Sequence, residues 1–108
     1  FRRVLFRSVF TAGQLGVDPT TGEFVSAEIS GQTRQALKNL QAVLEAGGAS
    51  LENVVKATVF LRDMDDFGAM NKVYAEFFTQ NPPARSAVQV ARLPKDAAVE
   101  IEAIAIVG

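Results

Sequence analysis

Hydrophobic residues recur along this chain with two spacings, and each spacing predicts one type of secondary structure. Apolar residues three and four positions apart indicate an amphipathic helix over residues 28–46 and a second helix over residues 66–79. Four segments are predicted as strands, residues 9–17, 53–62, 85–93 and 98–107, and the alternation of side chains between two faces is traced in the second and the last of them. Because the first two strands flank a long helix, we expect a crossover connection with parallel pairing between them.

Each predicted helix has one apolar face, which we expect to contribute to the core. In the first helix this face contains Ala36, Leu37, Leu40, Val43 and Leu44, and the opposite face contains Gln32, Arg34, Gln35, Lys38, Asn39 and Gln41. The pair Gly47 and Gly48 predicts its C-terminal cap. The apolar stripe of the second helix is Phe67, Met70, Tyr74, Phe77 and Phe78, and Asn71 adjoins it. The default expectation for Asn71 is a solvated side chain.

The predicted strands carry apolar residues on both faces. Val55, Ala57, Val59 and Leu61 share one face of the second strand, and Val99, Ile101, Ala103, Ala105 and Val107 share one face of the last strand. The other face of the last strand carries Glu100, Glu102, Ile104 and Ile106. Two helices can cover only one face of a sheet, so we expect self-association to cover the face that holds Glu100 and Glu102.

Two strand positions have features that suggest a function. Gly13 lies inside the first strand, where a glycine is typical of a bulge or of a close approach by another group; a bulge without a ligand is the simpler interpretation. Arg85 follows Pro82 and Pro83, which fix an extended approach to the third strand. A guanidinium held there suits a carboxylate or a phosphate, because it can bind either one through two donors. A surface ion pair is the alternative.

The composition narrows the possible chemistry. The 108 residues suit one domain, and they include no cysteine and no histidine. These absences exclude a thiolate nucleophile, a disulfide framework, a histidine base, and metal ligands of either type. The formal net charge is −1 and no basic run is present, which argues against nucleic acid as the main partner. No apolar run approaches the roughly 20 residues that a membrane span needs.

The first eight residues, Phe-Arg-Arg-Val-Leu-Phe-Arg-Ser, combine basic and apolar side chains. Their order resembles the translation of a common sequencing adapter. We therefore interpret residues 1–8 as a cloning or assembly remnant and residues 9–108 as the domain. A natural transcript that continues upstream of the same eight residues would contradict this interpretation.

Residues 83–105, PARSAVQVARLPKDAAVEIEAIA, closely resemble the C-terminal signature of the reactive-intermediate deaminase (RidA, YjgF-type) family, also called endoribonuclease L-PSP. The resemblance extends back through both predicted helices and covers everything from about Val9. It implies an α+β, chorismate-mutase-like domain with a mixed sheet and two helices on one face. It also implies a homotrimer with ligand clefts between subunits.

The implied activity is hydrolysis of 2-imino or 2-enamino acids, such as 2-iminopropanoate and 2-iminobutanoate, to 2-keto acids and ammonia, with no cofactor and no metal. Arg85 matches the arginine that grips the substrate carboxylate, and Glu100 matches the carboxylate that orients the attacking water. Asn71 matches a pocket-lining asparagine. Gly13 and Ala87 match backbone positions in the cleft.

The sequence departs from the family pattern in three places. Ala12, which we count among the substrate-binding positions, replaces a common serine, and Thr11 cannot supply the lost hydroxyl because strand alternation points it to the other face. Ala87 replaces a common cysteine. The family's first strands, with their Gly-x-Tyr-Ser-Gln motif, are missing, and the only tyrosine, Tyr74, lies on a predicted helix.

Two other functions are left open by the residues. One is a non-catalytic binder of small carboxylates that uses the same cleft. The other is a ribonuclease or translation inhibitor, as the older family name implies, although the net charge and the missing histidines weigh against it. We expect a cytoplasmic location, without distinguishing the cytosol from an organelle.

Overall fold

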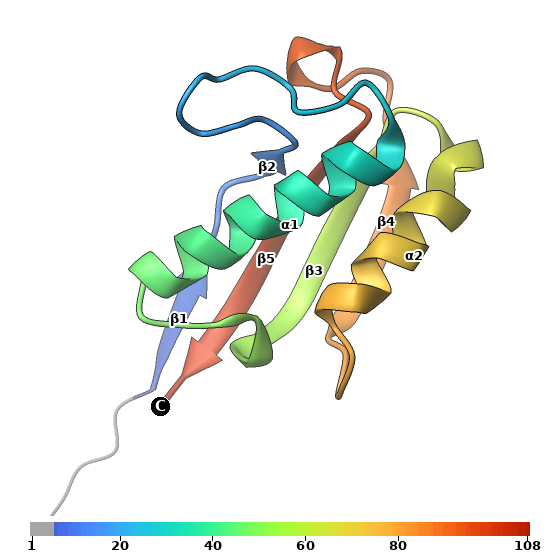
Figure 1. The fold of residues 1–108 in the computed structure, drawn as a ribbon. Coiled ribbons are helices and arrows are strands. Elements are labelled where there is room, and N and C mark those ends of the chain that lie inside the picture. The colour runs from blue at the N-terminus through green and yellow to red at the C-terminus, as the bar shows by residue number, and fades with distance from the viewer. Residues whose placement is uncertain (1–5) are drawn as a thin grey trace, which may run out of the picture.

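The computed structural model describes residues 6–108, which form a five-stranded sheet with two helices on one face (Figure 1). The strands are β1 (Arg7–Phe10), β2 (Gln14–Leu15), β3 (Val54–Leu61), β4 (Ala84–Gln89) and β5 (Val99–Val107). The helices are α1 (Ile29–Ala46) and α2 (Phe67–Phe77), and the 3₁₀ turns are η1 (Leu51–Asn53), η2 (Met64–Asp66) and η3 (Pro94–Asp96). The predicted α+β class is confirmed.

Strand β5 lies at the centre of the sheet. It pairs antiparallel with β1, β2 and β3, and β3 pairs in parallel with β4, which gives the order β1-β5-β3-β4 with β2 beside β5. The predicted pairing of the first and second strands is wrong, because β5 lies between them. A strand with apolar residues on both faces suits a central position with neighbours on both edges. The parallel pair is the one that α2 connects.

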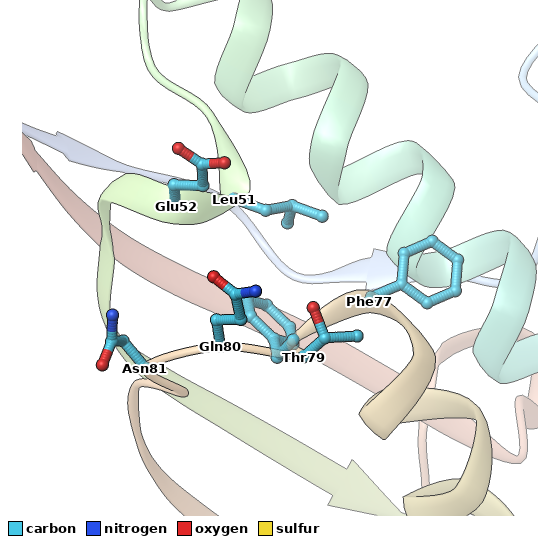
Figure 2. A pocket seen from close by; sticks show the side chains of 7 residues that line it. Leu51, Glu52, Phe77, Thr79, Gln80 and Asn81 are labelled. Atoms are coloured by element: carbon cyan, nitrogen blue, oxygen red, sulfur yellow. The ribbon is translucent and has the colours of Figure 1, made fainter.

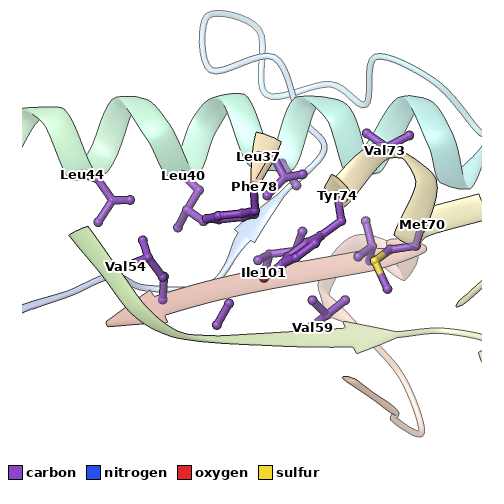
Figure 3. Close-up of a cluster of buried hydrophobic side chains, with 14 of the residues drawn as sticks. Leu37, Leu40, Leu44, Val54, Val59, Met70, Val73, Tyr74, Phe78 and Ile101 are labelled. Carbon is purple, nitrogen blue, oxygen red and sulfur yellow. The ribbon is translucent and has the colours of Figure 1, made fainter. Parts of the chain in front are cut away.

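The core lies between the helices and the sheet (Figure 3). The labelled core side chains are Leu37, Leu40 and Leu44 of α1, Met70, Val73, Tyr74 and Phe78 of α2 and its end, and Val54, Val59 and Ile101 of the sheet. A large apolar side chain contributes roughly 1.5–3 kcal/mol when fully buried. The predicted inner face of β5 is confirmed, since it is buried from Val99 to Ala105 and Val107 packs against the cluster.

Two polar residues that we assigned to the outer face of α1 make contacts inside the protein. Gln32 is 3% exposed; its Nε2 donates to the Ser26 carbonyl (3.1 Å) and its Oε1 accepts from the Ala98 N–H (2.8 Å). Asn39 Nδ2 donates to two carbonyls in the β2 region, at 2.8 and 3.0 Å. Val43, which we assigned to the core, is exposed instead. The packed face of α1 therefore includes amides that join it to β2 and to the start of β5.

The predicted glycine cap of α1 is confirmed for the second glycine of the pair. Gly48 has φ +83°, its N–H donates to the Glu45 carbonyl (3.0 Å), and the N–H of Ala49 donates to the Leu44 carbonyl (2.8 Å). This is the Schellman arrangement, which needs a left-handed residue. Gly47 has φ −86° and needs no such freedom.

A bulge in β3 reverses the predicted orientation of its first two residues. The pairing register with β5 shifts between Val54 and Lys56. As a result Val54 is 6% exposed and belongs to the core, whereas Val55, which we predicted to share a face with the buried Ala57, is 45% exposed. An extra residue in one strand changes the face of its neighbours, and the period-two pattern does not reveal it.

The remaining elements are shorter than predicted. Helix α2 ends at Phe77, and β4 ends at Gln89. Asp63 caps the turn η2 before α2, since its carboxylate accepts from the N–H of Asp65. Neither helix within residues 6–108 combines the length and the apolar character that a membrane span requires.

Candidate active site

The first predicted strand divides into β1 and β2 around residues 11–13. Thr11 Oγ1 accepts a hydrogen bond from the Ala103 N–H (3.0 Å), and the Thr11 N–H donates to the Ala103 carbonyl (3.0 Å). A hydroxyl thus replaces the backbone acceptor at the point where regular pairing with β5 stops. Ala12 is exposed at this junction, and its carbonyl accepts from the Gln14 side chain.

Gly13 allows a close approach at the same junction. A Cβ built on Gly13 would lie 2.6 Å from Cδ and 2.8 Å from Cγ of Glu100, and closer still to its carboxylate Oε2. Of the two interpretations of Gly13, the structure supports the close approach by another group. That group is the carboxylate that we predicted to orient water.

Glu100 lies on the sheet face that the helices leave open. It alternates with the buried Val99 and Ile101, and its partners in the register are Phe60 of β3 and Leu15 of β2. Directly paired residues share a face, so the half-buried Glu100 and Phe60 lie on the same side of the sheet. The predicted placement of Glu100 and Glu102 on the uncovered face is confirmed.

Arg85 lies on the other face, beneath α2. Its register partner in β3 is Ala57, which is fully buried on the helix side. Arg85 Nη1 donates to Asn71 Oδ1 of α2 at 2.6 Å. Asn71 is half-buried, so the default expectation of a solvated side chain is wrong. Its hydrogen bond with Arg85 is consistent with the prediction that Asn71 lines the pocket of Arg85.

Two aromatic rings of α2 surround the guanidinium. Its carbon, Cζ, lies 4.6 Å from the ring centroid of Tyr74 and 5.3 Å from that of Phe67. Burial raises the pKa of Tyr74 above its ordinary value, and the charge of Arg85 offsets part of that rise. The phenol is therefore neutral over the physiological range, and its interaction with Arg85 is of the cation–π type.

A pocket of about 370 Å³ opens beside Arg85. Its lining consists of Asn71, Tyr74, Ala75, Phe78, Pro82, Pro83 and Arg85. The walls are mostly apolar, and among the described residues that line the pocket Arg85 alone has a charged side chain. Such a pocket suits a small anion that carries an apolar group.

A larger pocket, of about 530 Å³, lies between η1 and the end of α2 (Figure 2). It is lined by Leu51, Glu52 and residues 77–81, and it contains none of the predicted site residues. The labelled polar side chains stand apart around it rather than converging on one point. We therefore place the candidate site at Arg85.

The predicted site residues fall into two groups that the sheet separates. Arg85, Asn71 and Ala87 lie on the helix side, where Ala87 is half-buried opposite the buried Val59. Glu100 lies with Gly13 beside the junction that contains Ala12, on the open side and toward the opposite edge of the sheet. One chain thus does not bring Arg85 and Glu100 together.

Tyr74 and Phe67 were predicted only as core residues, although both also contact Arg85. The sequence contains a signal for this contact. Phe67, Asn71 and Tyr74 follow one another at spacings of four and three, so they occupy one helix face. What the sequence does not show is that the edge strand brings Arg85 under that face.

Comparison with known proteins identifies the family. Residues 4–107 match the family described as endoribonuclease L-PSP, which is nearly the whole chain. The chain belongs to this family. The predicted resemblance is confirmed, because RidA and YjgF proteins are among the relatives and solved structures that match.

Members of the endoribonuclease L-PSP family align along most of their length with this chain. A RutC family protein of Pyrococcus horikoshii is 59% identical over 97 residues, which is 90% of this chain and 77% of that protein. The human 2-iminobutanoate/2-iminopropanoate deaminase is 47% identical over 102 residues, covering 94% of this chain and 74% of the human protein. The crystal structure of Escherichia coli TdcF with bound serine has a TM-score of 0.89 at 47% identity, covering 94% of this chain and 81% of TdcF.

Proposed function

We propose that this protein hydrolyses reactive 2-imino and 2-enamino acids, such as 2-iminopropanoate and 2-iminobutanoate, to 2-keto acids and ammonia in the cytoplasm. The observation that carries the proposal is the Arg85 pocket, a small and mostly apolar cavity. Among its described lining residues the only charge is the guanidinium of Arg85, which donates a hydrogen bond to Asn71. Relatives at about 47–50% identity that are named 2-iminobutanoate/2-iminopropanoate deaminase support the same activity.

Hydrolysis of a protonated imine depends more on holding the imino acid and one water molecule in place than on activating either of them. Arg85 binds the carboxylate of the imino acid through charge-assisted hydrogen bonds. Glu100 accepts a proton from water as the water oxygen bonds to C2 of the protonated imine. Glu100 then passes this proton to the nitrogen of the tetrahedral intermediate. The C2–N bond breaks and ammonia leaves, while the hydroxyl proton passes to Glu100 and then to solvent as the C2–O double bond of the keto acid forms. Holding two reactants in place can supply a large part of the rate acceleration.

We further propose a homotrimer of the chorismate-mutase-like type, with a cleft between each pair of neighbouring chains. In one chain Arg85 and Glu100 lie on opposite faces of the sheet, so one cleft would take Arg85 from one protomer and Glu100 from the next. The open face also exposes apolar side chains, among them Phe10, Val88 and Ile106. Covering such a surface is a common reason for assembly.

Mixing two inactive variants tests the shared site. Arg85→Ala and Glu100→Gln should each abolish most of the semicarbazide-trapped turnover of 2-iminopropanoate. When the two variants are unfolded and refolded together at equal amounts, about a quarter of the clefts regain both side chains if each cleft draws them independently from two chains. Recovery of activity toward that level supports the shared cleft, and no recovery in refolded mixed oligomers contradicts it.

A second candidate function is binding without catalysis, because the structure of TdcF contains a bound serine. A binder would bind 2-ketobutanoate saturably and leave the rate of imine loss unchanged. Turnover by the unsubstituted protein above the spontaneous rate separates the two functions. RNA cleavage that survives both Arg85→Ala and Glu100→Gln in highly purified protein would instead favour the ribonuclease.

A further inference from the structure

The hydrogen bond to Asn71 occupies a particular part of the Arg85 guanidinium. Asn71 Oδ1 takes a proton from Nη1, the terminal nitrogen on the Cδ side of the group. The opposite edge, formed by Nε and Nη2, makes no hydrogen bond to the described residues. A carboxylate can bind that edge through two parallel hydrogen bonds, and the contact with Asn71 remains in place.

Rotation of the guanidinium is limited by the ring of Tyr74. The ring centroid lies 4.6 Å from Cζ, whereas the Phe67 ring is more distant at 5.3 Å. Tyr74 is itself held in the core, because it is 5% exposed and stacks at 4.7 Å against Phe78 with an interplanar angle of 32°. Its ring lies among the buried side chains between the helices and the sheet (Figure 3), and this packing restricts its movement.

The hydroxyl of Tyr74 does not explain this arrangement. Tyr74 Oη is buried and has no hydrogen-bond partner among the described residues. A phenol in the core without a partner is less favourable than a phenyl ring of the same shape. The part of Tyr74 that acts on Arg85 is thus the face of the ring.

We propose that Tyr74 is a positioning residue, whose ring face fixes the guanidinium of Arg85 so that its Nε–Nη2 edge receives the ligand carboxylate. The inference rests on the proposed function, since it assigns the ligand of the same pocket. Asn71 fixes the rotation within the guanidinium plane, and Tyr74 fixes the plane itself. Phe67 supports the same orientation from a greater distance.

Three variants separate ring, hydroxyl and general packing. Tyr74→Leu removes the aromatic face, Tyr74→Phe removes only the hydroxyl, and Val73→Ala removes buried volume from the neighbouring core position, which does not line the pocket. All three are compared by KM and kcat for 2-iminopropanoate and by calorimetric binding of 2-ketobutanoate, at a temperature where each is folded by circular dichroism.

Loss of the ring face should weaken carboxylate binding by about 3- to 30-fold, the range expected for a partly desolvated cation–π contact. KM for the imino acid and Kd for 2-ketobutanoate should rise together in Tyr74→Leu, with kcat changed by less than about threefold, because the lost interaction is equal in ground and transition states. Tyr74→Phe should have the KM and the Kd of the unsubstituted protein, and Val73→Ala should alter neither constant.

Other outcomes overturn the proposal. Unchanged binding in Tyr74→Leu shows that the ring does not position Arg85, and weakened binding in Tyr74→Phe assigns the effect to the hydroxyl. An equal loss in Val73→Ala assigns it to general packing. If the unsubstituted protein binds 2-ketobutanoate but shows no turnover, the deaminase function fails, and the binding series still decides the role of Tyr74.

Discussion

Glu100 can lie against the junction between β1 and β2 only because residue 13 has no side chain. The carboxylate occupies the space that a Cβ would need, and nothing in the backbone of Gly13 itself requires a glycine, since its φ is not positive. Thr11 contributes to the same feature, because its hydroxyl ends the pairing of β1 in an ordered way. The position of one proposed catalytic group therefore depends on the size of a neighbouring residue.

Gly13→Ala should displace Glu100 and lower kcat by about 10- to 100-fold, because a shift of about 1 Å in a catalytic group costs rate on that scale. Stability should change little, since the atoms that must move belong to a flexible side chain. Steady-state kinetics and urea unfolding measure the two effects.

Gly68→Ala is the matched control, because a Cβ built on Gly68 has nothing within 4 Å apart from its chain neighbours and the nearby backbone of its own helix. It should leave kcat unchanged and stabilise α2 by up to about 0.5–1 kcal/mol. An unchanged kcat in Gly13→Ala would show that Glu100 does not need its present position.

At the scale of elements, the helices and the inner face of β5 could be predicted, because long amphipathic patterns record burial directly. The bulge in β3 and the contacts of Gln32 could not be predicted. A bulge depends on how two strands align, and a buried amide depends on which distant backbone groups need a partner. The predicted pairing of the first strand with β3 was wrong for a similar reason. The order of strands along the sequence does not show that β5 lies between β1 and β3 in the sheet.

The bulge yields a paired test within two adjacent residues. Val54→Ala should lower the free energy of unfolding by about 1–3 kcal/mol, because it opens a cavity in the core. Val55→Ala should change it by less than about 0.5 kcal/mol, since the side chain is exposed in the single chain. Urea unfolding shows which of the two variants loses more free energy of unfolding. A larger loss in Val55→Ala would indicate that side chains alternate regularly from the start of β3, without a bulge.

At the scale of the whole molecule, the sheet divides the candidate site and leaves one face open. The sequence indicated both the open face and Glu100 on it, because the last strand is apolar on both sides. It could not show that Arg85 faces the helices, since that depends on the register between β3 and β4. The residues proposed for the site could thus be named from the sequence, but their distribution over two faces could not be predicted.

Ile106→Asp tests whether the open face forms the proposed interface. Ile106 is 44% exposed and lies beside Ser8 in the register of β5 and β1. A carboxylate buried there without a partner should prevent assembly, so light scattering should report the mass of one chain and turnover should fall with it. Val43→Lys, an exposed change on α1, should leave mass and turnover unchanged. An assembled, active Ile106→Asp protein would contradict the interface.

In the proposed shared cleft, the separation of Arg85 and Glu100 by the sheet has a further consequence, namely that activity depends on protein concentration. Under that proposal, a lone chain carries the Arg85 half of one cleft on one face and the Glu100 half of another cleft on the opposite face, and it completes neither. On dilution below the dissociation constant of the assembly, turnover per chain should therefore fall, and it should return when the protein is concentrated again. For the proposed assembly, total turnover then rises more steeply than in direct proportion to the amount of protein.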